Sequence, residues 1–364
     1  MVGILNSLHI PTTLNGDTLN CRIPSFRDDI EYMADIAEEV MRIYGYDHIV
    51  GTPISGAVLR GTVTPERALE DKIKALLISN GLYEIATYSF IGSHSIDSLN
   101  LPKDDSRNNS IKILNPLGDE YSVMRTQLVT SMLTVVSTNM NRKNADARFF
   151  EISKRFIPKS LPMTEQPDEL KTLSIGVYGE NEDFYTLKGI VEQVMKLCCA
   201  EVKYERADEP YLHPGRAAKA VIGDKTVAVF GEVHPNTADK FDLTGRAYVA
   251  EIYLDMLSNT VSPLVIYSPL PKFPAVSRDL ALLCDSEVPV GDLLDIIKKA
   301  GGKLLESASI FDIYEGAQIP EGKKSVAFSL TLRSADATLT DEQTQTVMNK
   351  VIKKLSEAGA ELRR

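Results

Sequence analysis

Residues 325–333, SVAFSLTLR, alternate between large apolar side chains and small or polar ones. Successive side chains of a β-strand point to opposite faces of its sheet, so this alternation predicts a strand with one buried and one open face. We expect the apolar set to pack beneath helices and the other set to face outward. The apolar set is Val326, Phe328, Leu330 and Leu332, and the outward set is Ser325, Ala327, Ser329, Thr331 and Arg333.

The segments around this strand complete a small domain. They predict, in chain order, a strand (DLALLC), a helix (GDLLDIIKKAG), a strand (LESASIFDIY), the alternating strand, a second helix (DEQTQTVMNKVIKKLSEAG) and a short strand (ELR). Thr340 and Gln343 have the spacing of a capping box at the start of the second helix. The order βαββαβ is typical of a ferredoxin-like domain. A proline-rich stretch, SPLPKFP at 268–274, marks its start, so we assign this domain residues 268–364.

Residues 51–267 predict an α+β domain built on an antiparallel sheet. Its first stretch, GTPISGAVLRGTV at 51–63, is punctuated by Gly and Pro, as is typical of a linker. Thr64 and Pro65 then predict the start of a helix, and Gly81 predicts its end. Strands joined by short turns, with helices grouped between them, indicate this fold class. The predicted strands are 83–90, 110–114, 148–156, 173–178, 217–222, 227–233 and 247–254, and the predicted helices are 127–141 and 184–199.

Residues 1–50 predict only part of a small domain. The stretch from Phe26 to Tyr46 has apolar residues at helical spacing and Gly45 as a stop, so it predicts an amphipathic helix of about four turns. Upstream, Asn15-Gly16 predicts a turn, and LNCRIP predicts a short strand. We expect the earlier portion of this domain to belong to a longer parent chain.

Charge and cysteine content limit the classes of function. A net charge of -10 argues against a protein that coats nucleic acid through bulk electrostatics, because phosphate binding needs concentrated Lys and Arg. Any RNA contact must therefore be local. The four cysteines form no CxxC pair and predict reduced, structural thiols. No apolar run suggests a membrane span and the first residues do not resemble a secretion signal, so we expect a cytoplasmic protein.

Three separated stretches resemble the β subunit of bacterial phenylalanyl-tRNA synthetase, in the order that this family uses. The first, IPSFRDDIEYMADIAEEVMRIYGYDHI, is similar to the end of its B5 domain. The second, which comprises NPLGDEYSVMRTQLVTSML, ARFFEISKRF, DFYTLKGIVE and LHPGRAAKAVIGDKTVAVFGEVHP, is similar to its catalytic-like core. The third runs from KFPAVSRDLALL through FDIYEGAQIPEGKKSVAFSLTLRSADATLTDEQ and is similar to its ferredoxin-fold anticodon-binding domain. The resemblance covers nearly the whole chain.

The resemblance implies a part in the ligase that esterifies phenylalanine to tRNA(Phe) with ATP. It implies a partner α subunit that holds the ATP and phenylalanine sites, an assembly of two α and two β subunits, and a class II synthetase-like fold for the central domain. Such a fold holds ATP with an arginine in an FRxE strand and another after a GxGxxR turn. The strand ARFFEISKRF lacks the first pattern, and the chain lacks the second. We therefore assign no catalytic residue and expect this chain to be inactive alone.

Four carboxylates gather around the first predicted helix. Asp35, Glu38 and Glu39 are related by i, i+3 and i+4, which puts them on one helical face, and Asp29 lies just before the helix. Oxygen ligands of this kind suit Mg²⁺, but from the spacing alone a solvated acidic face near a helix N-terminus is the preferred interpretation. The resemblance favours magnesium, because the family's β subunit holds Mg²⁺ at these positions, at the junction with the α subunit.

Three further residues have open interpretations. Arg125, ahead of a predicted helix, is suited to a phosphate or a carboxylate, and equally to a salt bridge at the surface or between subunits. His213 and His234 each precede a proline, and without further metal ligands at recognisable spacing we expect them to bond loop backbone.

We expect the open face of the C-terminal sheet to contact RNA. The small and polar residues of 325–333 would leave a shallow platform for unstacked bases, with an aromatic ring on the neighbouring strand for stacking. The family usually has an arginine where this chain has Ala337, so one basic contact is absent. The predicted tRNA-contacting residues are Lys272, Arg278, Tyr314, Lys323, Lys324 and Arg333.

Two other functions remain open from the sequence. One is a stand-alone synthetase-like ligase that uses the central domain, and the missing arginines count against it. The other is a regulatory protein whose ferredoxin-like domain binds a small ligand, since that fold hosts many functions.

Overall fold

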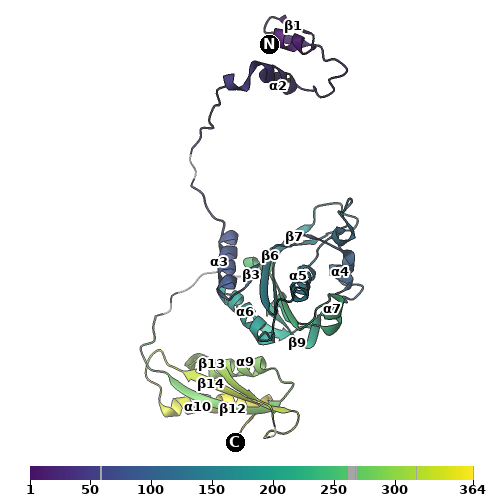
Figure 1. The fold of residues 1–364 in the computed structure, drawn as a ribbon. Coiled ribbons are helices and arrows are strands. Elements are labelled where there is room, and N and C mark those ends of the chain that lie inside the picture. The colour runs from purple at the N-terminus through teal and green to yellow at the C-terminus, as the bar shows by residue number, and fades with distance from the viewer. Residues whose placement is uncertain (58–59, 261–266, 268, 317, 364) are drawn as a thin grey trace. The chain divides into compact units, whose positions relative to one another are not determined.

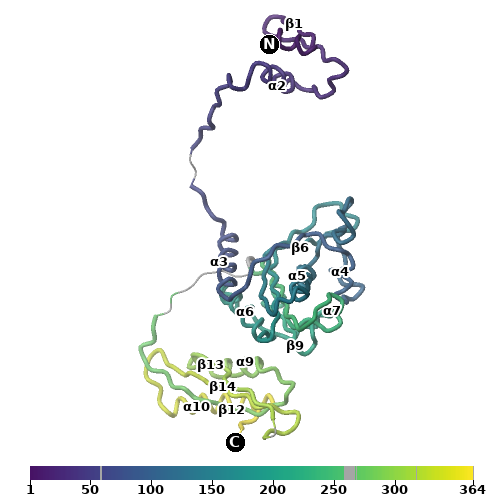
Figure 2. Tube along the Cα trace, in the orientation of Figure 1, coloured from purple at the N-terminus to yellow at the C-terminus, as the bar shows by residue number. Residues whose placement is uncertain are grey.

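The computed structural model describes the chain except residues 58–59, 261–266, 268, 317 and 364, and the side chains of 258–260. The chain divides into two compact units, residues 1–62 and 63–364 (Figures 1 and 2). Among its described residues the second unit holds a seven-stranded sheet, a four-stranded sheet and a short two-stranded sheet, and the two larger sheets are each described separately. The boundaries expected after residues 50 and 267 stay predictions, and Ser268 lies outside the described residues.

The first unit is a hairpin and two helices packed on a small core. Leu5, Ile10 and Ile30 are its buried centre. The turn predicted at Asn15-Gly16 is confirmed, with Gly16 at a φ of 62° that favours glycine. The elements are α1 (Val2–Ser7), β1 (Thr12–Asn15), β2 (Thr18–Cys21), α2 (Met33–Tyr44) and the 3-10 helix η1 (Tyr46–His48).

Two expectations for this unit are wrong. The sequence analysis missed α1, because six residues are too short for a helical period to stand out. The helix expected from Phe26 begins instead at Met33. Asp35 fixes this start, because its carboxylate accepts the backbone N–H groups of Glu31 (2.9 Å) and Tyr32 (2.7 Å).

The central sheet has seven strands in the order β3-β6-β7-β11-β10-β9-β8. Every neighbouring pair is antiparallel except β3 and β6, which are parallel. This confirms the α+β class and an antiparallel core. The strands are β3 (Tyr83–Glu84), β6 (Ala147–Ile157), β7 (Asp168–Tyr178), β8 (Lys203–Arg206), β9 (Leu212–Ile222), β10 (Lys225–Val233) and β11 (Ala247–Tyr253).

Helices cover both faces of this sheet (Figure 1). On one face α3 and α6 bury Ile73, Leu77 and Val191 against the sheet, and on the other α5 buries Met132. Gly176 of β7 lets α5 approach closely, since a Cβ atom there would lie 2.6 Å from the Met132 sulfur. The helices are α3 (Pro65–Ser79), α4 (Ser93–Asp97), α5 (Val129–Asn141), α6 (Phe184–Leu197), α7 (Pro235–Lys240) and α8 (Leu254–Thr260), with 3-10 helices η2 (Ser106–Asn108) and η3 (Asp119–Tyr121).

Four predicted strands of the central domain are wrong in extent. The strands expected from 173 and from 217 each begin five residues earlier, as β7 at Asp168 and β9 at Leu212. The strand expected at 83–90 divides into β3 and β4 (Phe90–Ile91), because between them the Thr87 N–H binds the Glu151 carboxylate and not a neighbouring strand. The strand expected at 110–114 is reduced to a single bridge between Lys112 and Val123 of β5 (Val123–Met124). The helix expected to start at 127 starts at Val129.

The last sheet has the order β13-β14-β12-β15, antiparallel throughout, which confirms the predicted ferredoxin-like fold. The alternation in 325–333 is also confirmed, since Val326, Phe328, Leu330 and Leu332 are all 0% exposed. The predicted capping box is present, with reciprocal bonds of 3.3 and 3.0 Å between Thr340 and Gln343. The elements are β12 (Val276–Asp285), α9 (Val290–Gly301), η4 (Gly302–Leu304), β13 (Leu305–Tyr314), β14 (Lys323–Leu332), α10 (Asp341–Glu357) and β15 (Glu361–Leu362).

Within the part of the chain that the structure describes, no helix has both the length and the apolar character needed to cross a membrane.

Candidate functional site

A row of polar side chains crosses the α5 face of the central sheet. Glu151 of β6, Ser174 of β7 and Glu251 of β11 are paired directly across the three strands, so their side chains share one face. All three are buried. A charged row on an otherwise apolar sheet is costly unless each group is paired, so it is the first place to look for a site.

Arg125 neutralises one end of this row. Its side chain is 0% exposed, and its Nη2 lies 3.4 Å from a Glu151 carboxylate oxygen and 2.5 Å from the Ser153 hydroxyl. Its Nη1 donates to the Thr87 hydroxyl at 2.7 Å, and its Nε donates to the Lys154 carbonyl at 3.0 Å. Burial lowers the pKa of Arg125, and the Glu151 carboxylate opposes that shift.

The partner of Arg125 is thus a carboxylate of its own chain. The alternative of a salt bridge at the surface or between subunits is wrong, because the guanidinium is wholly enclosed. Arg125 and Glu151 are 26 positions apart in the sequence, which hides this pairing from a sequence reading, since only the fold brings β6 beneath the start of α5.

Glu251 holds the other end of the row. Its carboxylate accepts the backbone N–H groups of Leu128 and Val129, at the N-terminus of α5, where a negative charge is favoured. Burial raises the pKa of Glu251, and these two N–H groups act in the opposite direction. Nearby, Arg155 stacks 4.6 Å from the centre of the Tyr253 ring. Arg125 and Arg155 are therefore both engaged by the chain itself.

The acidic helix face of the first unit is also paired internally. Arg27 bridges two of the predicted metal ligands, at 2.8 Å from Asp29 and 3.0 Å from Glu39. Arg42 binds the other oxygen of Glu39 at 2.7 Å. The Arg27 guanidinium holds the pKa of Asp29 below its usual range, and Arg42 and then Arg27 do the same for Glu39.

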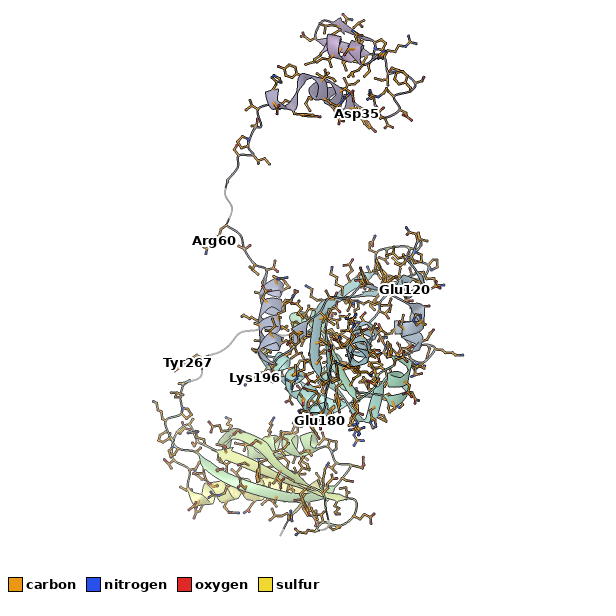
Figure 3. The ribbon with its side chains drawn as sticks, viewed as in Figure 1. Asp35, Arg60, Glu120, Glu180, Lys196 and Tyr267 are labelled. Carbon is orange, nitrogen blue, oxygen red and sulfur yellow. The ribbon has the colours of Figure 1, made fainter. Side chains whose placement is uncertain are left out.

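The four carboxylates do not converge on one point in this arrangement. Asp35, labelled in Figure 3, uses one oxygen to cap α2, and the side chain of Glu38 is exposed to solvent. Among the described residues no group of three or more His, Cys, Asp or Glu side chains is placed to hold a metal ion. The donors are of the type that Mg²⁺ prefers, but this arrangement does not fit it, because arginines take the place of the cation.

The open face of the C-terminal sheet carries two of the predicted RNA contacts. Tyr314 of β13 is paired with Ser325 of β14 and is 36% exposed. Arg363, which the sequence analysis did not select, reaches across this face, 5.9 Å from the Tyr314 ring centre and 3.2 Å from the Ser325 hydroxyl. No pattern in ELRR predicts that contact, because it depends on the strand order. Lys323 shares this face and lies 3.9 Å from Asp285.

Two predicted RNA contacts lie on the opposite, helix-covered face, so the expectation that they flank the platform is wrong for them. Arg278 is paired across the strands with the buried Leu330, and Lys324 with the buried Cys284. Lys324 is 9% exposed and donates to the Ser286 carbonyl at 2.8 Å. Both residues were expected near the platform because they are close to its strands along the chain. The register of β12 and β14 instead puts their side chains on the helix-covered face of the sheet.

The remaining two basic residues, Arg333 and Lys272, differ in how far their side chains are held by contacts within the chain. Arg333 binds Glu306 at 2.9 Å and the Phe273 carbonyl at 2.5 Å, so it ties β14 to the chain that precedes β12. Lys272 is exposed. The assignment of all six residues to tRNA contact stays a prediction.

The expectation that the two histidines bond backbone beside their prolines is confirmed. The Nδ1 atom of His213 accepts the Gly215 N–H at 3.1 Å, and that of His234 accepts the Asn236 N–H at the same distance. The expectation of loop backbone is wrong, because His213 and Gly215 lie in β9 and His234 caps the N-terminus of α7.

Family models match three parts of the chain, and all three describe domains of tRNA synthetases. Residues 1–46 match the tRNA synthetase B5 domain, residues 49–254 match the phenylalanyl tRNA synthetase beta chain CLM domain, and residues 271–363 match the ferredoxin-fold anticodon binding domain. The second match alone spans more than half of the chain. The chain belongs to the phenylalanyl-tRNA synthetase beta chain family.

Curated relatives agree along the whole chain. The phenylalanine–tRNA ligase beta subunit of Clostridium tetani is 44% identical over 99% of this chain, and that of Clostridium acetobutylicum is 41% identical over the same share. The match covers 46% of each relative, so the chain spans about half their length. Among solved structures, pyrrolysyl-tRNA synthetase from Desulfitobacterium hafniense is similar with a TM-score of 0.43 and 15% identity, over 53% of this chain and 68% of that one.

We predict that Arg125→Met destabilises the core by about 3–5 kcal/mol, because it leaves the Glu151 carboxylate buried without its cation. The double variant Arg125→Met, Glu151→Met should recover most of the loss, since it removes both charges. Native-state hydrogen exchange of β6 amides measures the local free energy, with the exposed Arg142→Met as control. A cost below about 1 kcal/mol for Arg125→Met would mean that the ion pair does not hold the core together.

Proposed function

We propose that this chain supplies tRNA contact and subunit assembly to a phenylalanine–tRNA ligase, and that it performs no chemistry alone. The match of residues 271–363 to an anticodon-binding domain carries this proposal. In the reaction, ATP, L-phenylalanine and tRNA(Phe) give Phe-tRNA(Phe), AMP and diphosphate. An α subunit holds the ATP and phenylalanine sites, and two α and two β subunits form the assembly. The family assignment favours this function over a stand-alone ligase or a regulatory small-ligand-binding protein.

The inactivity of the chain alone is supported by the central sheet. Stabilising ATP phosphates requires arginines aimed at the developing charge. Arg125 and Arg155 are each committed to carboxylates, hydroxyls or rings of this chain, so neither is free to bind a nucleotide without breaking its present contacts. The row Glu151–Ser174–Glu251 is buried beneath α5, and a ligand would have to displace that helix.

The RNA contact we propose is the open face of the C-terminal sheet. Tyr314 offers a ring for base stacking, and Lys323 and Lys272 offer charge for phosphates. Arg363 adds a planar cation beside the ring. Arg333 follows directly after β14 and binds the Phe273 carbonyl. Arg278 and Lys324 lie on the helix-covered face, where they donate to the Ser277 and Ser286 carbonyls.

We predict that Tyr314→Ala weakens binding of tRNA(Phe) without changing its salt dependence, because stacking involves no counterion. Lys323→Ala should weaken binding and reduce the slope of log K against log salt by about 1. Filter binding by the full chain across a salt series measures both quantities. Lys353→Ala, on the exposed side of α10, is the matched control for Lys323→Ala.

The expected loss for Tyr314→Ala is about 1–3 kcal/mol. Equal affinities and equal slopes for wild type, Tyr314→Ala, Lys323→Ala and Lys353→Ala would place the RNA contact elsewhere on the chain.

Mg²⁺ is the cofactor we propose for the acidic helix face, with Asp29, Asp35, Glu38 and Glu39 as ligands once Arg27 has moved away. In the present arrangement Arg27 satisfies Asp29 and Glu39, so the ion would bind weakly until a partner subunit changes these contacts. Mg²⁺ also keeps several of its waters, so one helix face gives it few protein ligands. The cytoplasm is the proposed location, in keeping with four cysteines that form no disulfide.

We predict that Arg27→Ala strengthens Mg²⁺ binding by about tenfold, because it removes the cation that competes for two carboxylates. Titration of MgCl₂ at constant ionic strength, followed by NMR shifts of amides in residues 29–42, measures the affinity. Arg22→Ala, which removes an exposed arginine nearby, should leave it unchanged.

Glu39→Gln in the Arg27→Ala background should abolish the gain. If no variant gives a saturable response to Mg²⁺, the four carboxylates are only a solvated and arginine-paired face.

A further inference from the structure

A hollow of about 380 Å³ opens on the central domain beside the buried Arg125 network. The segment around β4, the 3-10 helix η3 and the first turns of α5 form its walls. Its size lies within the range of natural ligand sites, and its lining is mainly apolar with a few polar groups. Glu120 of η3, which Figure 3 labels, is one of the residues that line it. The residues used below are Thr87, Tyr88, Phe90, Glu120, Tyr121 and Ser131.

Two aromatic rings form a corner in this hollow. The ring centres of Tyr88 and Tyr121 are 5.5 Å apart, and the ring planes meet at 74°. Tyr88 is 69% exposed and Phe90 is 38% exposed, so these rings lack a covering layer. In this edge-to-face pair the edge of one ring lies against the other, and the exposed ring face that stays uncovered carries the negative π density that attracts a cation.

The charges around the hollow also favour a cation. Glu120 is exposed, and within the described residues its carboxylate forms no ion pair. Its carboxylate folds back over Gly118, where a Cβ atom would lie 2.7 Å from an Oε2 atom. Behind the floor, Thr87 and Ser131 turn their hydroxyls toward Arg125, whose charge Glu151 already balances. His94 also lines the hollow, so with a neutral imidazole the net charge that faces it is negative.

Beside the hollow, the turn that leads into η3 exposes two leucines completely or nearly so. Leu114 is 101% exposed and Leu117 is 89% exposed. A free metabolite that fills the hollow would leave both leucines in water. A protein surface would cover them, since interfaces combine a buried anchor with an apolar surround.

We propose that this hollow receives an arginine or lysine side chain of a partner protein, whose apolar neighbours cover Leu114 and Leu117. The cationic head lies in the corner between Tyr88 and Tyr121, within reach of the Glu120 carboxylate, and the aliphatic stem lies along Phe90. Arginine fits best, because its planar group stacks on aromatic rings and is weakly hydrated. The hollow is lined by residues of the central domain and not of the C-terminal sheet. The proposed partner site can therefore be tested independently of the proposed tRNA contact.

The test uses the full chain and two small probes. Butylguanidinium carries the cation, and butylurea is a neutral group of nearly the same shape. Methyl NMR of Thr87, Ile91 and Val135, which line the hollow, reports binding. Butylguanidinium should bind at least about fivefold more tightly than butylurea. Glu120→Gln should weaken the cation about threefold and leave butylurea unchanged.

Glu180→Gln is the matched control, because it removes an exposed carboxylate elsewhere on the same domain (Figure 3). It should leave both affinities unchanged. Tyr121→Leu should weaken the cation, whereas Tyr121→Phe, which keeps the ring face, should retain it. Equal binding of the two probes, or a Glu120→Gln variant that binds butylguanidinium as well as wild type, would overturn the cation site.

A second arm tests the protein partner. The capped peptide Leu-Arg-Leu should bind more tightly than Leu-Gln-Leu, and Leu114→Ser should weaken the first peptide without affecting butylguanidinium. If Leu114→Ser leaves peptide binding unchanged, the apolar turn is no part of the surface and the proposed partner is wrong.

Discussion

The buried pair of Arg125 and Glu151 is the interaction on which the central domain depends. Its hydrogen bonds join the segment before β4, the strand β6 and the first turn of α5, which are remote in sequence. Removing either charge would leave the other in a low-dielectric interior, and that is far more costly than losing a surface pair. The same pair lies on the α5 face of the sheet, so the buried polar row stabilises the fold of this domain.

This use of charge recurs across the described parts of the chain. Arg27 and Arg42 neutralise the acidic face of α2, Arg333 ties β14 to Phe273, and Lys324 anchors a turn. Many of the side chains that the sequence suggests as ligands thus form their ion pairs and hydrogen bonds within the chain itself. Exposed charged side chains such as Lys272 and Glu120 remain available for ion pairs with a partner.

Periodicity and caps predicted the fold well, because they are local. The alternation in 325–333, the capping box at Thr340 and the helix start at Thr64 all hold in the structure. The misses have non-local causes. The face on which Arg278 lies depends on strand register, and the burial of Arg125 depends on β6 passing beneath it. The short helix α1 has too few residues for a period. Family resemblance supplied what spacing did not, namely the order of the three domains.

The most direct test of the account is phenylalanine-dependent exchange between ATP and pyrophosphate by this chain alone. The account predicts no exchange above background, because Arg125 and Arg155 already hold groups of the chain itself. Exchange above background that disappears on mutating a residue of this chain, such as Arg155→Ala, would contradict it.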